Sequence, residues 1–128
     1  MPDSIHIDKK RILVVDDEKG FTHMLKMALS ANYEIHEVNR PGDALGAARE
    51  FRPDLILLDV VMPTFDGGDL AAQFRSDPSL ASVPIVFVTA IVSPADGERE
   101  QVIDGYPFIA KPVSSEKLTQ TIEKYLKV

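Results

Sequence analysis

Three short runs of the chain are apolar at every position, and this pattern constrains the fold more than any other feature. The runs are residues 12–15, 55–58 and 84–88. A strand with one face in solvent alternates apolar and polar residues, whereas a strand covered on both faces does not. We therefore expect these runs to be strands of a parallel sheet that is covered on both sides.

Stretches with helical periodicity separate the strands. The apolar positions are Phe21, Leu25, Ala28 and Leu29 in the first stretch and Ala44, Leu45, Ala48 and Phe51 in the second. Met24 and Met27 lie at helical spacing with Phe21, so they too are expected in the core. Further helices are expected over residues 67–76, 94–103 and 116–127, although Pro94, Gly97 and Gly105 weaken the second of these.

Two less apolar segments complete the pattern. Residues 33–38 alternate apolar and polar side chains, and residues 106–110 contain Pro107, so both are expected as edge strands. Five strands that alternate with five helices predict an α/β fold with right-handed crossovers. The expected architecture is a flavodoxin-like (βα)5 three-layer sandwich, with a five-stranded parallel sheet in the order 2-1-3-4-5.

Length and charge narrow the class of protein. The 128 residues suit one domain, expected over 10–128 after a short tail at 1–9. A net charge of -6 argues against direct binding to nucleic acid, because phosphate backbones require clustered basic residues. The chain has no cysteine, and no apolar run reaches the ~20 residues of a membrane span. A cytoplasmic protein without a membrane segment is therefore expected.

Polar residues follow the apolar strands at the positions where ligands bind in parallel sheets. They are Asp16, Asp17 and Glu18 after the first strand, Asp59 after the third, Thr89 after the fourth and Lys111 after the fifth. Clustered carboxylates stay ionised only beside a cation, and Mg²⁺ is the hard ion that binds one or two carboxylates and phosphate oxygens. The set is typical of phosphoryl transfer, with Asp59 as nucleophile and Asp16 and Asp17 as metal ligands.

Each residue alone has a simpler interpretation. An aspartate at a strand end usually caps a helix or forms a turn, and acidic residues are favoured in the first turn of a helix. Thr89 alone would be a strand residue and Lys111 a solvated surface residue. Their joint occurrence at the ends of the correct strands favours the functional interpretation.

The chain resembles response-regulator receiver domains of two-component signalling, of the chemotaxis-regulator type, over residues 10–127. The residues that carry the resemblance are Val15-Asp16-Asp17-Glu18, Leu58-Asp59-Val60-Val61-Met62-Pro63, Asp66-Gly67-Gly68, Val88-Thr89-Ala90 and Lys111-Pro112. The resemblance implies that Asp59 accepts the phosphoryl group and that Asp17, Asp59 and the backbone carbonyl of Val61 hold Mg²⁺, with Asp16 acting through water. It also implies phosphate binding by Thr89, Ala90, Lys111, Val60 and Val61, a cis peptide bond between Lys111 and Pro112, and a switch made by Thr89 and Phe108.

The resemblance further implies partners. A sensor histidine kinase or a histidine phosphotransfer protein would donate the phosphoryl group, and a downstream protein would read the face made by the fourth helix, fifth strand and fifth helix. The resemblance allows a dimer that forms on phosphorylation. It implies no enzyme beyond catalysis of the chain's own phosphorylation and dephosphorylation.

Three other functions compete with this one. A Mg²⁺-dependent phosphatase of the haloacid-dehalogenase type would need a second aspartate where the chain has Val61. A degenerate receiver would act as an unphosphorylated interaction module, against which the intact set of polar residues argues. Flavin binding would need a phosphate loop after the first strand, which the sequence lacks.

Overall fold

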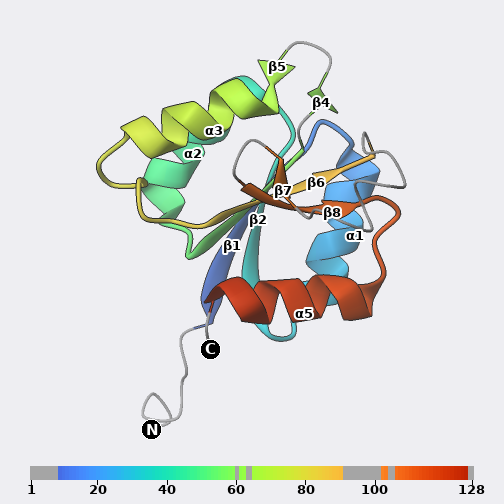
Figure 1. Ribbon diagram of the computed structural model, residues 1–128. Coiled ribbons are helices and arrows are strands. Elements are labelled where there is room, and N and C mark those ends of the chain that lie inside the picture. Colours follow the sequence, from blue (N-terminus) through green and yellow to red (C-terminus); the bar gives the residue numbers. More distant parts are fainter. Residues whose placement is uncertain (1–8, 60, 63–64, 91–101, 104–105, 127–128) are drawn as a thin grey trace, which may run out of the picture.

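The computed structural model of the chain describes residues 9–59, 61–62, 65–90, 102–103 and 106–126. Five parallel strands form its centre in the order β2-β1-β3-β6-β8 (Figure 1). Their bounds are Lys10–Val15 for β1, Tyr33–Val38 for β2, Leu55–Leu58 for β3, Ile85–Thr89 for β6 and Tyr106–Ala110 for β8. The predicted α/β fold with strand order 2-1-3-4-5 is confirmed.

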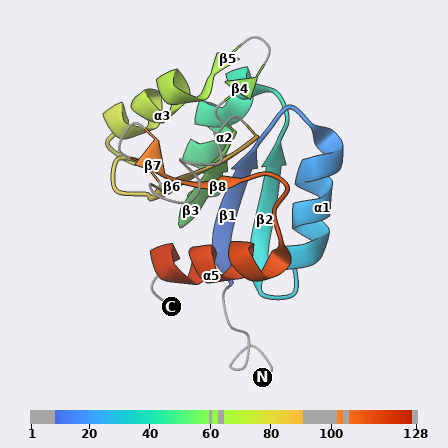
Figure 2. The same ribbon diagram turned by 45° about the vertical axis from the view of Figure 1, so that its right-hand side comes forward.

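Helices cover the sheet on both faces, as Figure 2 shows. The helices are α1 (Lys19–Leu29) and α5 (Ser115–Leu126) on one face, and α2 (Ala44–Phe51, after a 3-10 turn at Pro41–Asp43) and α3 (Gly67–Ser76) on the other. Successive residues of β1 enter different cores: Leu13 packs with the buried residues of α2 and α3, and Val14 with those of α1 and α5. Both faces of the strand are therefore apolar, which explains the uninterrupted apolar run.

Helix α1 buries Leu25 and Leu29 as expected, but not the whole stripe that was expected in the core. Thr22, Leu25 and Leu29 are its buried residues, whereas Ala28 is exposed. The prediction that Met24 and Met27 belong to the core is wrong, because they are 49% and 72% exposed. A polar residue takes the inward position because the Thr22 hydroxyl has a partner there, Glu37 Oε1 at 2.8 Å.

The far edge of the sheet also differs from expectation. Strand β7, Val102–Ile103, pairs antiparallel with β8. The helix expected over 94–103 is therefore wrong at its last two residues, where two β-branched side chains favour a strand; residues 94–101 lie outside the described part. Strand β8 consequently is not the outermost strand. A two-stranded hairpin, β4 (Val61–Met62) with β5 (Phe65–Asp66), was not expected either.

The ends of two helices follow known capping chemistry. Ser114 Oγ accepts a hydrogen bond from the Lys117 backbone N–H at 3.1 Å, so Ser114 caps the start of α5. Helix α2 ends at Arg52, whose φ of 55° is left-handed, and Pro53 then prevents continuation. None of the helices in the described residues combines the length and apolarity needed to cross a membrane.

Asp77 joins α2 to the loop after α3 and makes stability pH-dependent. Its carboxylate accepts hydrogen bonds from the hydroxyl and N–H of Ser79 at 2.7 and 2.9 Å and from Arg49 Nε at 2.6 Å. These partners, Ser79 first, lower the pKa of Asp77 below its ordinary 3.8. The lowered pKa means that the carboxylate stabilises the fold above pH 3.8, and that this contribution is lost as the pH falls through the lower folded value.

We expect Asp77→Asn to lower the urea midpoint at pH 7, with a difference from the wild type that shrinks as the pH falls below 3.8. Urea titrations across this range measure the effect, and Asp43→Asn, at an exposed aspartate, is the control. A difference that stays constant with pH would show that ionisation of Asp77 is not what stabilises this loop.

Candidate functional site

Backbone hydrogen bonds extend the sheet past the carboxyl ends of its strands. The N–H of Asp16 donates to the Val38 carbonyl at 3.0 Å, and the N–H of Asp59 donates to the Val15 carbonyl at 3.0 Å. The N–H of Lys111 donates to the Thr89 carbonyl at 2.9 Å. These residues are therefore fixed by the strand ladder, and their side chains meet at one rim of the sheet.

Three carboxylates gather at this rim. Asp16, Asp17 and Asp59 each contribute an oxygen to a set in which all atoms lie within 4.8 Å of one another. Asp16 is 1% exposed and Asp59 is 6% exposed, so little water screens their charges. Burial raises the pKa of Asp16, although hydrogen bonds from Lys111 and from the Glu18 N–H oppose this. The cluster stores repulsion that a cation would relieve.

Lys111 supplies a cation to the cluster. Its Nζ lies 2.7 Å from Asp16 Oδ2, 2.9 Å from Glu18 Oε1 and 3.7 Å from Asp59 Oδ2. It also lies 4.3 Å from the centroid of the Phe21 ring. Burial of the ammonium lowers its pKa, but the hydrogen bonds to Asp16 and Glu18 outweigh burial and raise the pKa overall. Lys111 is therefore charged at neutral pH. It lies 95 residues from Asp16 in the sequence, and the fold brings the two side chains together.

The donor set fits a small hard divalent ion. In octahedral Mg²⁺ sites the ligand oxygens lie ~2.1 Å from the metal, so two oxygens on opposite sides are about 4.2 Å apart. A spread of up to 4.8 Å brings the three carboxylates close to this geometry and leaves room for a bridging water at one of them. All three are oxygen donors, and no cysteine is present in the chain. Mg²⁺ suits this site better than a thiophilic metal.

The structure describes the remaining predicted site residues to different extents. Thr89 ends β6 and is fully buried, and Ala90 follows it in an exposed position. The Lys111–Pro112 peptide bond is cis, the isomer that the resemblance implies. Val61 belongs to β4, where only its backbone pairing is described, and Val60 lies outside the described residues.

Phe108 lies on β8, the strand that pairs with β6, which ends at Thr89. It is 5% exposed and sits opposite Phe87 in the pairing of β6 with β8. Its side chain belongs to the core on the α2 and α3 face. Phe108 is thus buried in this structure, on the strand that carries Lys111 at its end.

A polar network beneath the acidic cluster was missed by the sequence analysis. Asn39 Nδ2 donates to the Asp16 carbonyl at 2.8 Å and to Thr22 Oγ1 at 2.9 Å, and Thr22 in turn reaches Glu37. One feature of the sequence could have indicated this network. Asn39 directly follows an expected strand, and that strand neighbours the one that ends at Asp16. Glu18 was expected among the polar residues after the first strand, but its contact with Lys111 was not, and Phe21, which also contacts Lys111, was expected only as core.

We expect Asn39→Ala to weaken binding of Mg²⁺ severalfold and to lower the free energy of unfolding by about 1–2 kcal/mol, because the Asp16 carbonyl loses a partly buried donor. Isothermal titration with MgCl₂ and urea denaturation measure the two effects. Asn32→Ala, at an exposed asparagine in the turn after α1, is the control. Unchanged Mg²⁺ affinity would mean that Asn39 supports the fold but does not position the cluster.

Comparisons with known proteins agree on one family. The family model described as response regulator receiver domain matches residues 12–123. The polar-differentiation response regulator DivK of Brucella anthropi is 31% identical over 118 residues, which span 91% of this chain and 96% of that protein. The chemotaxis protein CheY4 of Vibrio cholerae superposes with a TM-score of 0.79 at 26% identity, covering 91% of this chain and 98% of that one. A putative response regulator from Chloroflexus aurantiacus gives a TM-score of 0.80 at 25% identity, covering 94% and 100%.

Proposed function

Because this chain belongs to the family of response regulator receiver domains, we propose that it accepts a phosphoryl group from a phosphohistidine onto Asp59. Receiver domains are signalling domains and not classical enzymes. The catalysis proposed here is confined to the chain's own phosphorylation and dephosphorylation. The observation that carries the proposal is the Lys111 ammonium 3.7 Å from Asp59 in a buried cluster of three carboxylates.

The chemistry assigns each group at the rim one task. An oxygen of Asp59 attacks the phosphorus, the bond from phosphorus to the histidine nitrogen breaks, and the imidazole leaves with the electron pair and takes up a proton. Lys111 and the Thr89 hydroxyl hold the transferred oxygens, together with the backbone at Val60, Val61 and Ala90. Little water reaches Asp59, which favours these electrostatic contacts.

Asp17, Asp59 and the Val61 carbonyl would hold Mg²⁺, with Asp16 acting through a water. When bound, the ion neutralises charge on the carboxylates and on the phosphoryl oxygens. The three carboxylates within 4.8 Å of one another support this, since the single positive charge of Lys111 does not balance them. Asn39 and Thr22 position the Asp16 backbone for this role.

The output would be a change at Thr89 and Phe108. The Phe108 ring is already buried in this structure. We propose that phosphorylation favours this inward ring further, because Thr89 vacates space when it moves toward the phosphoryl oxygens. That shift would alter the face that the resemblance assigns to the fourth helix, fifth strand and fifth helix, of which β8 and α5 are described and residues 94–101 lie outside the described part.

Receiver domains interact with kinases and with downstream targets. For this chain the proposed donor is a sensor histidine kinase or a histidine phosphotransfer protein, and the proposed target is a protein. A dimer that forms on phosphorylation is one form the output could take. With a net charge of -6, direct contact with nucleic acid is not part of the proposal.

The test is intact mass after incubation with acetyl phosphate, with Mg²⁺ and with chelator. We expect one phosphoryl adduct per chain that requires the metal. No adduct from acetyl phosphate or from any phosphorylated histidine phosphotransfer protein would favour an unphosphorylated interaction module. Sustained hydrolysis of p-nitrophenyl phosphate would favour a phosphatase, and we expect none.

A further inference from the structure

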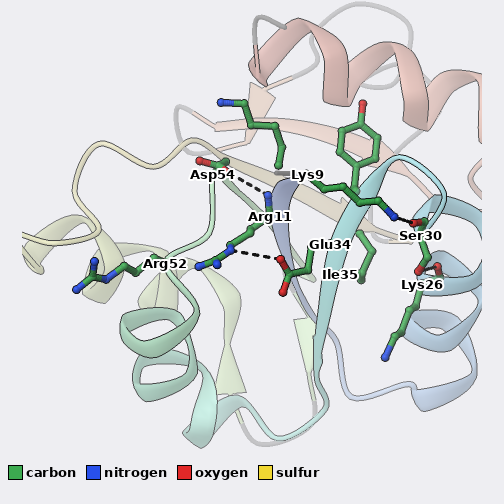
Figure 3. A pocket seen from close by; sticks show the side chains of 10 residues that line it. Lys9, Arg11, Lys26, Ser30, Glu34, Ile35, Arg52 and Asp54 are labelled. Atoms are coloured by element: carbon green, nitrogen blue, oxygen red, sulfur yellow. Dashed lines mark hydrogen bonds and ion pairs between the residues drawn. The ribbon is translucent and has the colours of Figure 1, made fainter. Parts of the chain in front are cut away.

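A basic pocket lies at the opposite end of the sheet from the acidic cluster. It has a volume of about 830 Å³ and opens at the amino-terminal ends of β1 and β2 (Figure 3). Arg11 in the pocket is five residues from Asp16 along β1, a length of about 16 Å at ~3.3 Å per residue. The pocket therefore does not share a ligand with the proposed phosphorylation site.

The pocket concentrates positive charge in an acidic chain. Five basic and two acidic side chains line it: Lys9, Lys10, Arg11, Lys26 and Arg52 against Glu34 and Asp54. Both acidic groups are engaged by Arg11, whose Nε lies 3.4 Å from Glu34 Oε1 and whose backbone N–H donates to Asp54 at 2.8 Å. The Arg11 guanidinium also donates to the Phe51 carbonyl at 2.8 Å. Arg11 is thus held in place and largely neutralised.

The other basic groups keep their charge uncompensated. Lys10, Lys26 and Arg52 are exposed and form no ion pair with an acidic residue among the described parts of the chain. Lys9 Nζ donates to the Ser30 carbonyl at 2.7 Å, a neutral partner. Figure 3 shows Arg52 and Lys26 on opposite sides of the two strands. A hollow whose lining carries net positive charge attracts anions.

We propose that the basic pocket binds a small anion that carries two or more phosphate groups. The basic side chains come from Lys9 and β1, from α1 and from the residue after α2, so they are spread around the pocket, which suits an anion with several charged groups better than a single phosphate. The volume falls in the range of about 300–1,000 Å³ typical of sites for nucleotide-sized molecules. The buried residues Tyr33 and Ile35 give the pocket an apolar floor against which a base or sugar could pack.

The test is isothermal titration of the full chain with inorganic tripolyphosphate and, separately, with ATP, both in chelator so that no metal bridges the ligand to the acidic cluster. The key variant is Lys10→Gln, Lys26→Gln, Arg52→Gln. Its matched control is Arg40→Gln, Lys117→Gln, Lys124→Gln, which changes the net charge equally at basic residues outside the pocket. Asp59→Asn is included to separate this site from the proposed phosphorylation site.

We expect both probes to bind the wild type, the pocket variant to bind at least tenfold more weakly, and the control and Asp59→Asn to bind as the wild type does. Tighter binding of ATP than of tripolyphosphate would identify a nucleotide, and equal binding a phosphate chain. Failure of both probes to bind, or equal weakening in the pocket variant and its charge-matched control, would overturn the proposal. Because Asp59→Asn separates the two sites, either result leaves the phosphorylation proposal to its own test.

Discussion

Replacement of Asp59 by asparagine is expected to remove the phosphoryl adduct completely, from one per chain to none. An amide is a poor nucleophile toward phosphorus, whereas the Asp59 carboxylate is buried at 6% exposure beside a charged lysine. Asparagine preserves the shape of the side chain, so the fold is retained. Intact mass after incubation with acetyl phosphate and Mg²⁺ measures the result.

The same variant also reports on the charge of the cluster. Removing one of three carboxylates within 4.8 Å relieves repulsion, so we expect Asp59→Asn to be at least as stable as the wild type in chelator. Asp43→Asn, at an exposed aspartate far along the chain, should accept a phosphoryl group as the wild type does. An adduct on Asp59→Asn that maps to another residue would refute Asp59 as the acceptor.

The strands of the sheet could be predicted because each central strand corresponds to one contiguous apolar run in the sequence. Residues 55–58 and 85–88 have side chains in both cores, so each of these positions had to be apolar. The burial of Thr22 on α1 could not be predicted from periodicity, because it depends on a hydrogen bond to Glu37, a residue of β2. Met24 and Met27 then remain on the solvent side, although their hydrophobicity predicted burial.

The residues at the strand ends predicted where the site lies, but not the contacts between its side chains. Asp16, Asp59 and Lys111 meet because parallel strands end at one rim, which the order of the strands already implied. The Lys111 contacts with Glu18 and with the Phe21 ring depend on how the loop after β1 turns. Asn39 and the Glu18 N–H each form a hydrogen bond to Asp16 at that turn, and the sequence does not show that these pairs of residues meet.

Charge is distributed unevenly along the strands of this domain. The carboxyl ends of β1 and β3 carry three clustered carboxylates, whereas the amino-terminal ends of β1 and β2 carry the basic pocket. The net charge of -6 therefore hides two regions of opposite sign. A cation and a polyanion would bind at opposite ends of the same sheet.

Replacement of Lys111 by methionine is expected to have the largest effect on stability. Its Nζ contacts Asp16, Glu18 and Asp59, and its side chain is 13% exposed. Methionine fills a similar volume but leaves buried carboxylates without a counter-charge, which costs about 2–3 kcal/mol of unfolding free energy in chelator. Loss of the ammonium also removes a contact to the transferred phosphoryl group, so phosphorylation by acetyl phosphate should slow by about 100-fold.

Urea denaturation with and without Mg²⁺ distinguishes lost charge from lost packing. If charge is the cause, Mg²⁺ supplies positive charge to the same carboxylates and should stabilise Lys111→Met more than the wild type. The exposed control Lys117→Met should change stability by less than about 0.5 kcal/mol. Equal stabilisation of the wild type and Lys111→Met by Mg²⁺ would show that lysine and metal do not neutralise the same charges, and the assignment of Lys111 to the cluster would then have to be abandoned.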